Sequence, residues 1–130
     1  MLEDKATNSG ENVLLSYQCL QNKNLLNYVK SIILIQMPFM ERRTYSTFVK
    51  QWPDGISQLD RVTVTSPDID LLSYPNADIG NIDKIIEMML GCLQRIKDYP
   101  KLGYQIFQEI PEDVWRAGQE LLSTGRYKLC

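Results

Sequence analysis

The chain of 130 residues contains no histidine. This absence excludes the Ser-His-Asp and Cys-His nucleophile systems and every zinc site with imidazole ligands. Its three cysteines, Cys19, Cys92 and Cys130, are far apart and include no CxxC pair. Because their number is odd and the chain is long enough to form a core without crosslinks, we expect reduced thiols and a cytoplasmic location. No metal site is predicted.

Long apolar runs and an excess of positive charge are also missing. No run approaches the ~20 apolar residues that a membrane span needs, so no span is expected in this chain. Residues 1–5 are polar and acidic, unlike a signal peptide. The formal net charge is −2 and there is no basic tract, so we predict no binding of nucleic acid.

The composition is that of one folded domain. Hydrophobic residues make up 44% of the chain and charged residues 23%, which is close to globular averages. A chain of this length is enough for one domain and too short for two. Residues 1–130 are therefore predicted to form a single domain.

The order of hydrophobic patterns predicts an α/β fold with about four helices. The expected elements are a helix over about 10–22, a strand over 31–36, a helix over 41–50, a strand over 61–65, a helix from a cap at Asn81 or Asp78 to about 97, and a helix from Pro111 to before Gly125. Alternation of helices and strands predicts a small parallel sheet.

Two strands are too few for a complete parallel sheet. Parallel strands normally have neighbours at both edges and helices on both faces. The continuous apolar run of residues 32–35 has the composition of a buried central strand. Either a strand escapes the pattern, or the chain is part of a larger domain, and we favour the second. The edge of the sheet would then be covered by a partner, by a swapped second copy of the chain, or not at all.

Residues 36–45 are the most informative stretch, because they place Arg42 and Arg43 after a strand and in the first turn of a helix. Ligands bind at the carboxyl ends of strands in open α/β sheets, and cations in a first turn oppose the helix dipole. We therefore predict an arginine clamp for phosphate or carboxylate. Adjacent helical residues point about 100° apart, so one arginine is expected to face the ligand. A solvated pair, or ion pairs with Glu41 or Asp60, is the alternative.

Two interpretations are open for the start of the first helix. Asn8 is a typical N-cap residue, and Glu11, three positions later, completes a capping-box pattern. Alternatively, Thr7, Asn8 and Glu11 form a loop beside a ligand.

Several blocks of the sequence resemble the YdcF/SanA/ElyC-like proteins, a bacterial family of unknown function, and its YdcF-type branch in particular. In chain order, these blocks are residues 3–12, 38–48 with 51–53, 64–67, 91–100 and 108–115. The resemblance implies the carboxyl-terminal part of a Rossmann-like, three-layer domain whose glycine-rich amino-terminal half has no counterpart here. Cys92 stands where similar members carry an aspartate.

The resemblance also implies a function. Members are associated with bacterial envelope biogenesis, and we expect a small anionic or nucleotide-like ligand at the carboxyl edge of the sheet. The predicted ligand-binding residues are Thr7, Asn8, Glu11, Arg42 and Arg43. In an enzyme, Glu11 would be a general base and an arginine would stabilise phosphate charge; no cofactor is assigned. The alternative is a non-catalytic remnant or interaction module that uses its exposed sheet edge, including for self-association.

Overall fold

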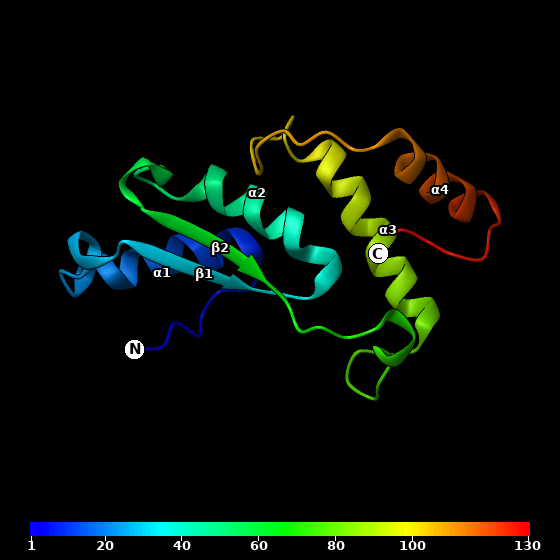
Figure 1. The fold of residues 1–130 in the computed structure, drawn as a ribbon, viewed down its shortest axis with the longest axis horizontal. Helices are drawn as coiled ribbons and strands as arrows, with labels where there is room; N and C mark the ends of the chain where they lie inside the picture. Colours follow the sequence, from blue (N-terminus) through cyan, green and yellow to red (C-terminus); the bar gives the residue numbers. More distant parts are fainter.

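The computed structural model describes residues 1–130 and contains four α-helices and two strands (Figure 1). In chain order, these are α1 (Ser9–Asn22), β1 (Ser31–Ile35), α2 (Glu41–Gln51), β2 (Arg61–Thr65), α3 (Ile82–Asp98) and α4 (Glu112–Ser123). The predicted α/β class, parallel sheet and four helices are confirmed. None of the helices has the length and apolar character that crossing a membrane requires.

The sheet consists of β1 and β2 alone. The strands run parallel, with Ser31 opposite Arg61 and Ile35 opposite Thr65. Helix α2 makes the crossover between them, as parallel strands require. In both strands the side chains alternate between half-buried and exposed. One face of the sheet is therefore covered and the other is open.

The prediction that residues 31–36 form a buried central strand was wrong. The side chains of Ile33 and Ile35 are 66% and 72% exposed. The physical reason is that α1 and α2 lie on one face only and that β2 pairs with one edge only. Of the three expected layers, the sheet and the helices on one of its faces are present. The apolar composition of β1 is that of a strand with both faces covered.

The main core lies between α1, α2 and the covered face of the sheet. Its buried members are Val13, Tyr17, Phe48 and Trp52, and its half-buried members include Ile32, Leu34 and Val62. The rings of Tyr17 and Trp52 meet edge to face at 5.1 Å, and those of Phe48 and Trp52 lie 5.0 Å apart. Aromatic pairs of this kind contribute about 0.5–1.5 kcal/mol beyond their burial.

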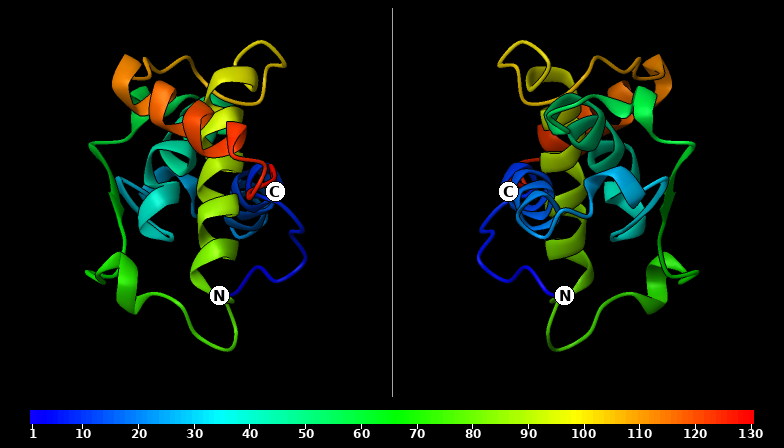
Figure 2. Two further views of the ribbon diagram at one scale, coloured as in Figure 1. Left: turned by 90° about the vertical axis from the view of Figure 1, so that its right-hand side faces the viewer. Right: turned by 90° about the vertical axis from the view of Figure 1, so that its left-hand side faces the viewer.

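Helices α3 and α4 form a second packed pair beside α2 (Figure 2). The side chain of Asn81 accepts a hydrogen bond from the backbone N–H of Lys84 at 3.0 Å, so Asn81 rather than Asp78 caps α3. Glycines allow close approach to α3. A methyl group added at Gly118 would lie 2.6 Å from Cδ2 of Leu93, and one added at Gly91 would overlap the carbonyl oxygen of Cys130.

The connection between α3 and α4 folds back onto α2. The N–H of Ile106 donates to the carbonyl of Ser46 at 3.2 Å, and Nε2 of Gln51 donates to the carbonyl of Tyr104 at 3.1 Å. Helix α2 therefore contacts α1 and the sheet on one side and the segment after α3 on the other.

Candidate functional site

The start of α1 is held by its own side chains. Oδ1 of Asn8 accepts a hydrogen bond from the N–H of Glu11 at 2.9 Å. Oε2 of Glu11 accepts from the N–H of Thr7 at 2.7 Å and from its hydroxyl at 2.8 Å. These bonds, the Thr7 backbone N–H first, lower the pKa of the Glu11 carboxyl below its usual value. Asn8 is thus confirmed as the N-cap of α1, whereas Glu11 accepts from Thr7 rather than from the Asn8 N–H of a capping box. Glu11 carries a negative charge at neutral pH.

The two adjacent arginines diverge. Nη2 of Arg42 donates to the carbonyl of Glu109 at 2.6 Å, so this exposed side chain ties α2 to the segment before α4. Arg43 is half-buried and points toward α3, with Nη1 3.8 Å from Sγ of Cys92. Its guanidinium carbon also lies 5.7 Å from the centroid of the Tyr99 ring. Neither arginine pairs with a carboxylate, so the ion-pair alternative is not what holds them.

Arg43 is left with an unpaired polar atom. Its Nε is buried and has no hydrogen-bond partner. An arginine donates through five N–H groups and has no neutral form in proteins. The only partners around this cation are a thiol and an aromatic face, and neither neutralises its charge.

A hollow of about 400 Å³ lies between the start of α1, the inner side of α2 and the segment that follows α3; we call it the polar hollow. Its lining residues are Asn8, Ser9, Gly10, Glu11, Leu14, Arg43, Thr47, Gln51, Tyr99 and Tyr104. Three of the five predicted ligand-binding residues, Asn8, Glu11 and Arg43, come together in it. Thr7 supports Glu11 from outside the lining, and Arg42 points elsewhere.

The polar hollow combines three kinds of surface. It has one carboxylate, from Glu11, and one cation, from Arg43. The rings of Tyr99 and Tyr104, 5.3 Å apart and edge to face, form an aromatic wall. Such a site is suited to a ligand that carries an anionic group together with hydroxyls or a ring.

Sequence reasoning missed both tyrosines and Gln51. In the sequence, Tyr99 stands directly before Pro100, a position that indicates the end of a helix rather than a binding site. Tyr104 follows Gly103, which has a positive φ of 78° and turns the chain back toward α2. The spacing of residues along the sequence carries no sign of that return.

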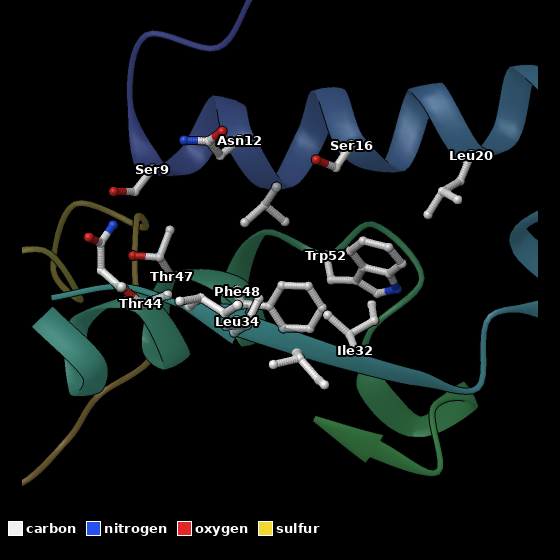
Figure 3. A pocket seen from close by; sticks show the side chains of 14 residues that line it. Ser9, Asn12, Ser16, Leu20, Ile32, Leu34, Thr44, Thr47, Phe48 and Trp52 are labelled. Carbon is white, nitrogen blue, oxygen red and sulfur yellow. The ribbon is translucent and has the colours of Figure 1, made fainter. Parts of the chain in front are cut away.

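A second hollow of about 390 Å³ runs between α1 and the unpaired edge of β1 (Figure 3); we call it the edge groove. Val13, Ser16 and Leu20 line it from α1, residues 32–35 of β1 and the following Gln36 line the opposite side, and Phe48 and Trp52 of the core also line it. Ser9 and Thr47 line both hollows. The polar hollow therefore adjoins the edge groove near the carboxyl end of β1.

Comparison with known proteins gives one informative match. No protein-family model matches the chain, and no solved structure matches it. An uncharacterized protein of Streptomyces coelicolor is 35% identical over 125 residues. The match covers 96% of this chain and 53% of the relative, so the chain spans about half the length of the curated relative that it matches.

Proposed function

We propose that this chain is the carboxyl-terminal part of a YdcF-type, Rossmann-like domain, and that it binds a small anionic or nucleotide-like ligand in the polar hollow. The observation that carries the proposal is the state of Arg43, a half-buried cation with a buried, unpaired Nε and no carboxylate partner. A partly buried charge without a partner is costly. A phosphate or carboxylate in the hollow would accept hydrogen bonds from the guanidinium and neutralise its charge.

The other walls of the polar hollow narrow the ligand class. The ionised carboxylate of Glu11 accepts hydrogen bonds, so it suits hydroxyl groups of a sugar and repels a second phosphate. The Tyr99 and Tyr104 rings offer a face to a base or a sugar ring. Nucleotides and sugar phosphates combine these features, whereas inorganic phosphate uses Arg43 alone.

The position of the hollow agrees with the proposal. Ser9 and Thr47 connect it to the end of β1, where ligands of open α/β sheets are expected. Cys92 affects whether Arg43 is available to a ligand, because proteins that this sequence resembles carry an aspartate at that position. A carboxylate next to Nη1 of Arg43 would pair with the guanidinium, whereas the thiol leaves it available to a ligand.

Binding rather than catalysis is what the residues support. A general base works best with a pKa near the operating pH, and the hydrogen bonds from Thr7 lower the pKa of Glu11. This carboxylate is therefore a weak base at neutral pH and a stable hydrogen-bond acceptor. The link to envelope biogenesis stays a prediction from resemblance.

The test is calorimetric titration and thermal melting of the chain with nucleotides and sugar phosphates. Arg43→Gln should weaken binding about tenfold or more, since a hydrogen bond to a charged group contributes about 1.5–3 kcal/mol. Arg42→Gln is the matched control and should bind as the unmodified chain does, because Arg42 donates to the Glu109 carbonyl and does not line the polar hollow. If no ligand binds, or if Arg43→Gln binds equally well, the proposal is wrong.

The second candidate is an interaction module. It is favoured by a separate observation, the exposed Ile33 and Ile35 on a strand with one unpaired edge. Unpaired edges are templates for pairing with another chain, including a second copy.

A further inference from the structure

The open edge of β1 has backbone groups without partners in the sheet. The carbonyl of Lys30 accepts from Asp60, and the N–H of Gln36 donates to Thr65, so these two residues face β2. Successive residues of a strand direct their backbone groups to alternate sides. The N–H and C=O groups of Ile33 and Ile35 therefore face the edge groove.

Helices α1 and α2 cover the same face of the sheet. Val13 and Tyr17 of α1 and Phe48 of α2 belong to one core, against which Ile32 and Leu34 of β1 pack. Figure 3 shows α1 running along β1, with the edge groove between them. Helix α1 makes more extensive contacts with α2 than with the sheet. Helix α1 thus covers space beside β1 in which no strand lies.

The handedness of crossovers predicts that a further strand lies in that space. Strand–helix–strand connections between parallel strands are right-handed in about 98% of cases. The unit β1–α2–β2 places its helix on the covered face and β2 at one edge of β1. Suppose that a parallel strand precedes α1 and that α1 leads from it to β1 on the same face as α2. A right-handed connection then places this strand at the edge of β1 opposite to β2. Residues 1–7, which lead into α1, form no strand.

We propose that the edge groove takes an apolar β-strand, parallel to β1, from a segment outside residues 1–130 that is equivalent to the part of the Streptomyces coelicolor relative that this chain does not match. Only 53% of that relative is covered by the match, so a segment of comparable length is available in it. This inference does not rest on the ligand of the polar hollow.

The lining of the edge groove fits a strand. Ser9, Asn12 and Ser16 of α1 are spaced by three and four residues and present small or short polar side chains to the groove. Short side chains let another backbone approach. Val13 and Leu20 supply apolar contacts for its inward side chains, and the free N–H and C=O groups of Ile33 and Ile35 complete the ladder.

The experiment is co-expression of this chain with the unmatched part of the relative, followed by size-exclusion chromatography with light scattering. A one-to-one complex is expected. Ser16→Trp fills the groove from α1 and leaves the residues of β1 unchanged, and Ile33→Pro removes one edge N–H; each should weaken the complex at least tenfold. Ile33→Ala keeps that N–H and is the matched control, with little expected change. Thermal melting of each variant alone establishes that it is folded.

A chimera that joins the unmatched part to this chain, in the order of the relative, gives a second measurement. Its melting temperature should exceed that of the chain alone, and Ser16→Trp should remove the gain. The proposal is overturned if neither the co-expressed pair nor the chimera shows these effects. It is also overturned if the chain alone forms a dimer that Ser16→Trp disrupts, because a second copy would then occupy the groove.

Discussion

The helix pairs α1/α2 and α3/α4 are held together by opposite means. In the first pair, the large rings of Tyr17, Phe48 and Trp52 fill the interface. In the second, Gly118 of α4 leaves room for the Leu93 side chain of α3, and on another side of α3 Gly91 leaves room for the backbone of Cys130. An interface filled by rings should be sensitive to truncation, whereas one built on glycines should be sensitive to enlargement.

The largest expected effect comes from emptying the aromatic interface. Phe48 is 2% exposed, and Phe48→Ala should lower the free energy of unfolding by about 3–5 kcal/mol. Urea denaturation of Phe48→Ala and of the unmodified chain measures the loss. Val114→Ala, at a site on α4 that is 45% exposed, is the control and should change stability by about 0.5 kcal/mol or less. A similar loss in both variants would contradict the contrast between the pairs.

A smaller effect is expected from enlarging Gly91, where α3 meets the carboxyl-terminal residue Cys130. Gly91→Ala gains about 0.5–1 kcal/mol of helix propensity. In the full chain, its methyl group overlaps the Cys130 carbonyl, and overpacking of this kind typically costs 1–3 kcal/mol. We expect a net loss of about 1 kcal/mol by urea denaturation. In a chain shortened by residues 128–130, the same change should stabilise, and a loss of equal size there would show that the contact with Cys130 is not the cause.

The smallest effect concerns a polar contact at the rim of the aromatic interface. The hydroxyl of Tyr17 donates to Oδ2 of Asp54, which raises the pKa of Tyr17. A raised folded pKa means that the contribution is complete below the unfolded value of about 10 and is lost as the pH rises through the folded pKa. The unmodified chain should therefore lose stability more steeply above pH 10 than Tyr17→Phe does. Thermal melting of both proteins at a series of pH values from 8 to 11 measures the difference. Equal dependence of the melting temperature on pH in the two proteins would refute the prediction.

Elements with a local signal were predictable from the sequence. The strand over residues 61–65 is rich in β-branched residues, and its predicted bounds are those of β2. The cap at Asn8 and the end of the last helix before Gly125 also follow from short-range chemistry. These features depend on residues within one or two turns of each other.

Features that depend on distant packing were not predictable in the same way. The 100° rule indicated that one arginine would face a ligand, but not which one. Arg42 donates a hydrogen bond to Glu109, 67 positions away, and Arg43 donates one to Cys92, 49 positions away. The exposure of Ile33 has a related origin, because the residues of β1 alone do not say which neighbours this chain supplies.

Helix α2 lies between α1 and the α3/α4 pair, and this place has a consequence for unfolding. It shares the aromatic core with α1, receives the Ile106 N–H at Ser46 and packs against α3. Neither pair can open fully without uncovering a face of this helix. We therefore expect the backbone amides of α2 to exchange with solvent more slowly than those of α4, in which Gly118 is the buried residue.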